Sequence, residues 1–119
     1  MTSKPTWFRL DADLFDNPKI MRAGTEATLL WMRGIAYSAR HLTDGWIPEP
    51  LPKRWGYTRK HTETLERHVL WIPLEITDDG GWLINDYADY QPTRAEWGEY
   101  IEKRKAAGRA GAAKRWGHT

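Results

Sequence analysis

The sequence predicts one domain of the α+β class, a winged helix-turn-helix. It is expected to be mostly helical, with a short first strand, a two-stranded wing, a C-terminal helix and a basic tail. Two short helical patterns joined by a glycine-containing turn at 49–69 form a helix-turn-helix signature. Two β-prone runs around an acidic, glycine-rich turn follow at 70–85 and predict a hairpin directly behind the helix pair. A further helical pattern follows at 94–106.

Length and composition support a single globular domain. The chain has 119 residues, of which 40% are hydrophobic and 29% charged, and its eight Trp residues supply large side chains for a core. Because Cys is absent, neither disulfide bonds nor a thiolate metal site is expected. No stretch approaches the roughly 18 uncharged residues that span a bilayer, and no apolar run near the start would direct export. We therefore expect a cytoplasmic protein that does not contact membranes.

The first part of the chain predicts a strand and a short helix. Residues 7–10 have the composition of a short first strand. Asn17 is a suitable helix cap and Pro18 a suitable first helical residue, so a helix is expected to begin there. Gly24 predicts the end of this helix.

A longer helix that serves as the scaffold is predicted next. Thr25 is a suitable cap, and apolar residues at i, i+4 and i+7 spacings predict a helix over 26–40. Residues 43–45 have turn chemistry, and 46–48 are interpreted as a short extended piece.

The helix-turn-helix follows this extended piece. Its first helix spans about 49–55 and ends at Gly56. Thr58 is expected to cap the second helix, whose inner face carries Leu65 and Val69.

The wing is predicted from strands at 70–77 and 82–85 around a turn at 78–81. Asp78 and Asp79 at its tip have the wrong charge for the phosphate backbone, so no phosphate contact is expected there. Either the hairpin mainly packs the core or its tip faces a protein.

A Thr-x-x-Glu capping box at 93–96 opens the C-terminal helix. Trp97 and Ile101 give this helix one apolar stripe. The stripe either completes the core of the chain or pairs in a homodimer, and the sequence leaves both open.

The net charge of +2 hides a strong asymmetry. Residues 103–119 hold six basic residues and no acid, which leaves 12 of the 18 basic residues against all 16 acidic residues before them. Local charge is therefore the test of a nucleic-acid interface. The predicted domain covers 1–106, and 107–119 is expected to be a basic flexible tail because it is rich in Gly and Ala. This tail is either disordered or a frayed extension of the helix before it.

A basic island over 53–67 coincides with the helix-turn-helix, since it holds five basic and two acidic residues. The second helix is expected to enter the major groove of double-stranded DNA, with its first half at the base edges and the preceding basic residues at phosphates. The alternative is a charged face that serves only solubility. The expected contacts from the island are Lys53, Arg54, Thr58, Arg59, Lys60, Glu63, Thr64 and Arg67.

The basic tail is expected to follow DNA phosphates, and its small residues would let it approach a groove. The alternatives are a solubilising end or a linker. Its expected contacts are Lys103, Arg104, Lys105, Arg109, Lys114 and Arg115.

Two Trp residues in the basic segments raise separate questions. Trp55 has the spacing that places it on the face packing against the scaffold helix, and we expect a structural role. The alternative is an exposed platform that stacks an unpaired base. Trp116 has no predicted element to bury it, so it either stacks on a partner or packs back on the body.

Catalysis finds little support in the sequence. His61 and His68 are seven residues apart, roughly 10.5 Å along a helix, which is too far to share one metal ion. The pattern at 108–115 lacks the Gly-Lys-Ser/Thr end of a phosphate-binding loop. No Gly-x-Ser-x-Gly occurs, and Asp86 and Asp89 are interpreted as turn and cap residues. We expect no enzyme activity, no cofactor and no metal.

Four stretches in this order carry a resemblance to a known family: WFRLDADLF at 7–15, TDGWIP at 43–48, DDGGW at 78–82 and NDYADYQPTR at 85–94. Over roughly residues 6–110 the chain resembles the N-terminal winged-helix domain of phage replication initiators and replisome organisers, especially those of actinobacterial hosts. The resemblance implies a phage or prophage protein that binds double-stranded DNA in replication initiation, by origin recognition or replisome organisation. Two alternatives stay open, a module that binds a host replication or regulatory protein and a transcriptional repressor.

Overall fold

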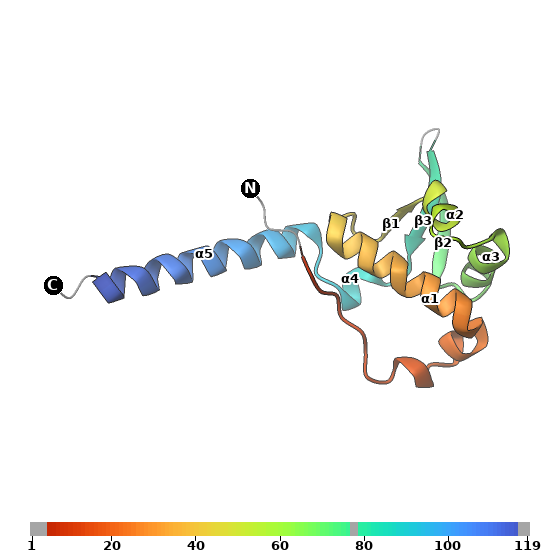
Figure 1. Ribbon diagram of the computed structural model, residues 1–119, viewed down its shortest axis with the longest axis horizontal. Helices are drawn as coiled ribbons and strands as arrows, with labels where there is room; N and C mark the ends of the chain where they lie inside the picture. Colours follow the sequence, from red (N-terminus) through yellow and green to blue (C-terminus); the bar gives the residue numbers. More distant parts are fainter. Residues whose placement is uncertain (1–4, 77–78, 117–119) are drawn as a thin grey trace.

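A helix that is broken once near its start forms the scaffold of the fold. The computed structural model describes residues 5–76 and 79–116, and in it α1 (Pro18–His41) is the longest helix of the body (Figure 1). The side-chain oxygen of Asn17 caps this helix by accepting a backbone hydrogen bond of 2.9 Å. Gly24 interrupts it with φ 85° and ψ 170°, so the break predicted at this glycine is confirmed.

The segment before α1 is not a strand. Residues 7–10 are irregular, and one 3-10 turn, η1 (Leu14–Asp16), leads into α1. The backbone N–H of Arg9 donates to the side-chain oxygen of Gln91 at 2.8 Å, and the Gln91 amide donates back to the Arg9 carbonyl. The first strand predicted there is therefore wrong, because a buried side chain takes bonds that a neighbouring strand would have taken.

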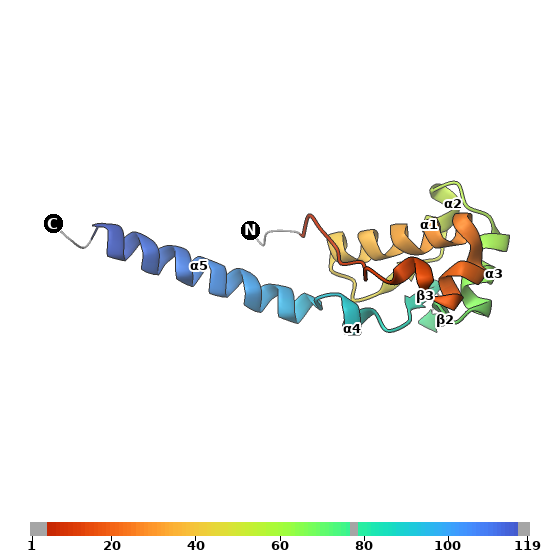
Figure 2. The same ribbon diagram turned by 90° about the horizontal axis from the view of Figure 1, so that it is seen from below.

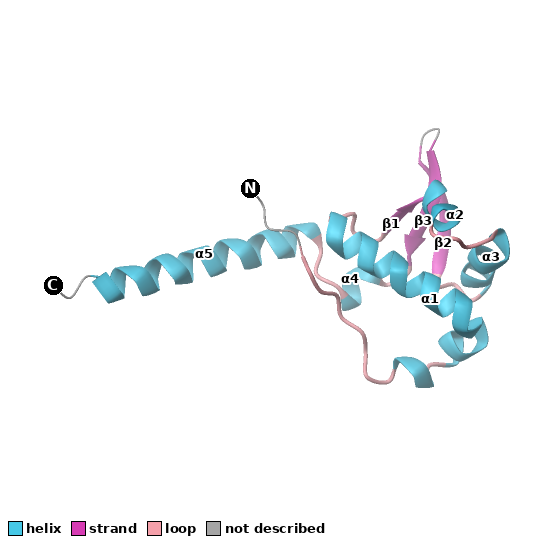
Figure 3. Ribbon diagram, viewed as in Figure 1, coloured by secondary structure: helices cyan, strands magenta, loops and turns pink. Residues whose placement is uncertain are grey.

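Three antiparallel strands form the sheet, in the order β1-β3-β2 (Figure 3). They are β1 (Trp46–Pro48), β2 (Trp71–Ile76) and β3 (Asp79–Ile84). β1, the predicted extended piece, pairs with β3 so that Ile47 lies opposite Trp82. We call the hairpin of β2 and β3 the wing. The α+β class is confirmed, and a helix pair followed by this hairpin is compatible with a winged helix.

The wing differs from the prediction at its turn. Gly80 and Gly81, predicted in the turn, belong to β3. A Cβ on Gly81 would collide with the carbonyl oxygen of Ile47 in β1, so the close approach of the two strands requires glycine there. The predicted tip residue Asp78 lies outside the described residues, and Asp79 begins β3.

The predicted helix pair consists of α2 (Pro50–Arg54) and α3 (Arg59–Arg67). Gly56 in the turn between them has φ 91°, a conformation that favours glycine. Leu65 is fully buried on the inner face of α3, as predicted. Val69 is not on that face, because α3 ends before it and Val69 is 50% exposed.

The core lies between α1, α3 and the sheet. Four large side chains there have no exposed surface: Leu30, Ile47, Leu65 and Trp71. Gly34 brings α1 close to the sheet, since an added Cβ would lie 2.7 Å from the Trp71 ring. Burial of these side chains, at roughly 25 cal/mol per Å² of apolar surface, is the main favourable contribution to folding.

A short helix that the sequence did not predict, α4 (Tyr87–Tyr90), connects the wing to the C-terminal helix. Tyr87 is buried against the turn that follows α1. Burial raises the pKa of Tyr87 above the usual 10.0, Asp44 adds to the rise, and a hydrogen bond with Ser38 opposes it. The phenol is therefore protonated at neutral pH.

The C-terminal helix α5 (Arg94–Trp116) is longer than predicted. The predicted cap at Thr93 is confirmed, since the backbone N–H of Glu96 donates to Thr93 Oγ1 at 3.2 Å. The reciprocal half of the capping box differs, because the Glu96 carboxylate accepts from the Thr93 hydroxyl at 3.2 Å. Trp97 and Ile101 are 5% and 7% exposed, so they complete the fold of the chain itself. The apolar stripe is therefore not a free surface for pairing in a homodimer.

α5 continues through the first ten residues of the predicted tail, from 107 to Trp116, as the helical extension that the sequence left open. Ala, Lys and Arg favour helix, and basic residues near a helix C-terminus interact well with the helix dipole. The side chain of Trp116 and residues 117–119 lie outside the described residues. Beyond its first two turns α5 projects away from the body (Figures 1 and 2).

Within the described part of the chain, no helix combines the length and the apolar character that crossing a membrane requires.

Candidate nucleic-acid interface

The outer face of α3 gathers most of the side chains predicted to read DNA. Lys60, Glu63, Thr64 and Arg67 follow one another at i, i+3, i+4 and i+7, which places them on one stripe. Three of them are exposed and Thr64 is half-buried. The opposite face holds the buried Thr62 and Leu65 and fixes α3 on α1.

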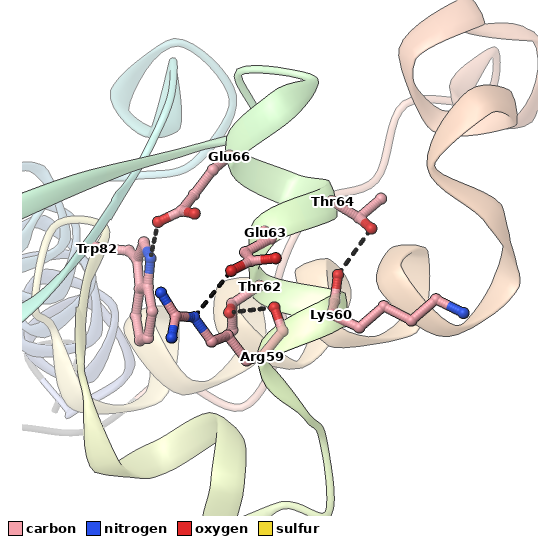
Figure 4. A network of polar contacts seen from close by, with 7 residues as sticks. All are labelled: Arg59, Lys60, Thr62, Glu63, Thr64, Glu66 and Trp82. Carbon is pink, nitrogen blue, oxygen red and sulfur yellow. Dashed lines mark hydrogen bonds and ion pairs between the residues drawn. The ribbon is translucent and has the colours of Figure 1, made fainter.

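Arg59 begins α3 and is held by an ion pair on this surface. Its Nε lies 2.8 Å from Glu63 Oε1, while 89% of the Arg59 side chain is exposed (Figure 4). An exposed pair of this kind adds little to stability. The contact is made through Nε, and the terminal nitrogens of a guanidinium are the atoms that form a bidentate contact with guanine O6 and N7.

The hydroxyl of Thr64 is partly committed within the helix. Thr64 Oγ1 donates to the Lys60 carbonyl at 2.8 Å, and Thr62 Oγ1 donates in the same way to the Arg59 carbonyl at 3.0 Å. Thr64 therefore presents its methyl group and an accepting oxygen to a ligand. The methyl suits contact with the methyl group of thymine.

Thr58 has a structural role at the start of α3. Its backbone N–H donates to His61 Nδ1 at 3.1 Å, and its hydroxyl lies 3.2 Å from the same nitrogen. These contacts close a capping arrangement in which His61 stands where Glu or Gln is usual. Nδ1 of His61 is thus engaged in the helix cap.

A hydrogen bond that the sequence did not reveal links α3 to the wing. Trp82 Nε1 in β3 donates to Glu66 Oε1 in α3 at 3.0 Å (Figure 4). The two residues are 16 apart, so periodicity within either element gives no signal for the contact. It links the orientation of the wing to that of α3.

The space between α3 and the wing is acidic. A hollow of about 1050 Å³ is lined by four glutamates and two basic residues, namely Glu49, Glu63, Glu66, Glu75, Lys53 and Arg59. Phosphate would meet net negative charge there. Lys53, Arg59 and Glu63 line this hollow and are also exposed. The surface that suits DNA is the side of α3 with Lys60, Thr64 and Arg67, together with the exposed Arg54 at the end of α2.

Trp55 packs on the scaffold helix, as predicted. Its ring lies 5.8 Å from that of Tyr37 and 5.4 Å from the Arg33 guanidinium, both in α1. Arg33 also donates to the Trp55 carbonyl at 3.4 Å. The ring is half-buried, so it is not a free platform for an unpaired base.

We expect Trp55→Ala to lower the free energy of unfolding by about 2 kcal/mol, less than for a fully buried Trp, because part of the ring already contacts water. Urea unfolding followed by circular dichroism measures this loss. If stability is unchanged while DNA binding disappears, Trp55 contacts DNA and the packing role is wrong.

The basic residues of α5 form a second charged surface. Four of them are exposed, namely Lys103, Arg104, Lys105 and Arg109. Lys105 Nζ lies 3.8 Å from Glu102 Oε1, one turn earlier in the helix. Lys114 and Arg115 belong to the same helix, but their side chains lie outside the described residues. Figures 1 and 2 place this part of α5 and α3 at opposite ends of the long axis. The structure therefore does not bring the two predicted basic sets together.

No metal site is apparent among the residues that the structure describes, since no three His, Asp or Glu side chains converge.

Asp86 occupies the cap position of α4 but makes no capping hydrogen bond with its side chain. Asp44 instead accepts a bond of 2.7 Å from the backbone N–H of Arg94 and ties the start of α5 to the body.

Comparisons of the chain with models of protein families, with characterised protein sequences and with solved protein structures found no match. The candidate interface therefore rests on the geometry and chemistry of this chain alone.

Proposed function

We propose that the protein binds double-stranded DNA and reads it in the major groove with α3. The observation that carries the proposal is the outer stripe of α3, where basic and hydrogen-bonding side chains share one exposed face of a short helix. The opposite face packs on α1, and Glu66 joins α3 to the wing. A rigidly held helix with such a face is the element that enters the major groove in helix-turn-helix proteins.

The roles of the side chains follow from their chemistry. Arg59 and Lys60 reach base edges at the start of α3, with Arg59 suited to guanine. Glu63 accepts from cytosine N4 or holds Arg59 in place. Lys53 and Arg54, exposed at the end of α2, contact phosphates.

The proposed biological role is replication initiation in a phage or prophage, in the cytoplasm. It is supported by the resemblance of the stretches at 43–48 and 85–94 to phage initiator domains. A repressor would use the same surface on a different target. Mapping the DNA fragments that the protein enriches from its source genome separates the two, since an initiator enriches an origin and a repressor enriches promoters.

The acidic hollow between α3 and the wing favours a second candidate, a module that binds a basic protein partner such as a host replication or regulatory protein. The two candidate interfaces share Lys53, Arg59 and Glu63 but suit ligands of opposite charge, DNA phosphates for one and a basic protein for the other. DNA binding depends on the release of counterions from phosphates, whereas binding in the acidic hollow does not.

A salt titration on duplex DNA tests the proposal directly. With about six phosphate contacts, affinity is expected to fall by roughly three orders of magnitude between about 50 and 200 mM salt. Fluorescence anisotropy of a labelled duplex of random sequence measures the slope. Absence of duplex binding even at about 50 mM salt would rule out the DNA proposal and favour the protein partner.

A further inference from the structure

Charge alternates along the chain in three blocks after residue 52. Residues 53–67 hold five basic and two acidic residues, and 103–119 hold six basic and no acidic residues. Between them, 68–102 hold eight acidic residues and a single basic one. Two positive surfaces are thus separated in sequence by a strongly negative segment.

In the fold, the two basic segments lie far apart in space. The chain measures 66 × 37 × 22 Å along its principal axes, with α3 near one end and the basic half of α5 at the other (Figure 1). The last buried side chain of α5 among the described residues is Ile101, and residues 102–109 are all exposed. The 15 residues from 102 to 116 extend the helix by roughly 22 Å, at about 1.5 Å per residue.

This projecting half of α5 is only marginally stable as a helix on its own, although its Ala, Lys and Arg residues favour helix. It has Gly108 and Gly111 in its interior, and an isolated helix of about 15 residues is marginal in water. Its six basic charges repel one another, although their place near the helix C-terminus is favourable. A polyanion stabilises such a segment, and a continuous basic helix in the major groove is an established mode of DNA binding. Charge complementarity thus selects duplex DNA as the occupant.

The body between the two surfaces does not suit a duplex that runs along the whole molecule. A hollow of about 700 Å³ beside the segment before α1 is lined by five aspartates and two basic residues, namely Asp11, Asp13, Asp16, Asp86, Asp89, Arg9 and Lys19. A single duplex that contacts both ends on this side would pass this negative surface.

We propose that the chain is bivalent for DNA: α3 holds one duplex segment, the basic half of α5 holds a second, and the protein bridges them. This inference rests on the proposed function for the α3 end and adds a second, independent site. The α5 site has no predicted base-reading residue, so it holds DNA of any sequence through phosphates.

A bridging assay with short duplexes tests the inference on the full chain. A duplex of about 12 base pairs is roughly 40 Å long, at about 3.4 Å per base pair, and cannot contact both ends of the molecule. One such duplex is immobilised and a second, fluorescent one is offered in solution at about 50 mM salt. We expect the protein to retain the fluorescent duplex, and a large excess of protein to abolish retention by saturating each duplex separately.

Matched variants assign the two sites. Each of three double variants removes one Lys and one Arg: Arg59→Ala/Lys60→Ala in α3, Lys103→Ala/Arg104→Ala in α5, and Lys19→Ala/Arg22→Ala on the body as control. The first two are expected to reduce bridging about ten-fold and the control to leave it unchanged. Replacing the six basic residues of 103–115 by Gln, which retains helix propensity, is expected to leave one duplex per chain in sedimentation analysis.

The outcomes separate this inference from the proposed function. If the protein binds one duplex but never retains a second, bivalency is wrong while the α3 proposal stands. If bridging persists in the six-fold Gln variant, two copies of the chain supply it and α5 is not a DNA site. If the six-fold variant alone binds DNA normally but loses a protein partner, the α5 surface serves protein. If no variant and no wild-type protein binds DNA, the proposed function itself fails.

Discussion

Replacing Arg59 and Lys60 together by alanine is expected to lower the affinity for a preferred duplex by about 2 to 3 kcal/mol, roughly 30- to 150-fold. Both side chains are exposed at the start of α3, where a helix in the major groove meets base edges. The loss should be largest for the preferred sequence and small for random duplexes, because base contacts supply specificity and phosphate contacts supply general affinity. Selection from a random library identifies the preferred duplex, and anisotropy measures both affinities.

Two further variants sharpen this result. Arg59→Lys keeps the charge but loses the planar fork, so it should lower discrimination between sequences while affinity for random DNA is retained. Lys19→Ala/Arg22→Ala, which removes the same charges from the start of α1, should change neither quantity. Equal losses for preferred and random duplexes in the Arg59→Ala/Lys60→Ala variant would mean that α3 contacts only phosphates.

The parts of the fold that depend on neighbours in sequence were predictable. The cap at Asn17, the break at Gly24 and the Thr93 cap that starts α5 each need only a few adjacent residues. The strand predicted at 7–10 failed because a strand needs a partner, and here Gln91 takes the backbone of Arg9 instead. Such a bond between distant residues has no local signature.

One part of the candidate site was also predictable from local sequence and another part was not. A period of 3.6 residues correctly places Lys60, Glu63, Thr64 and Arg67 on one exposed stripe of α3. The start of α5 is tied to the body by a bond between Asp44 and the Arg94 backbone, 50 residues apart, and by burial of Trp97 and Ile101. Such long-range contacts have no local signal, so the separation of the two basic surfaces could not be predicted from sequence. The sequence shows that both segments are basic, whereas only the fold shows that they lie at opposite ends of the molecule.

Trp71→Ala is expected to lower the free energy of unfolding by about 3 to 5 kcal/mol, a large part of the roughly 5 to 15 kcal/mol that stabilises a small domain. Trp71 is fully buried, and its ring lies 5.4 Å from that of Trp82, which holds the wing on α3. Its removal leaves a cavity in the core on which α3 and the sheet pack. Urea unfolding measures the loss, and DNA binding should fall only to the extent that the protein is unfolded.

A double-mutant cycle with Gly34 shows whether this contact is the cause. Gly34→Ala alone should destabilise by about 1 to 3 kcal/mol, because its Cβ would lie 2.7 Å from Trp71 Cζ2. In a Trp71→Phe background that carbon is absent, so the same Gly34→Ala change should be neutral or stabilising, since Ala favours helix over Gly by about 1 kcal/mol. Additive effects would mean that α1 and the sheet are not in contact at Gly34. If Gly34→Ala destabilises the wild type but not the Trp71→Phe variant, the two residues are coupled. The close packing of α1 on the sheet then occurs at this one pair of residues.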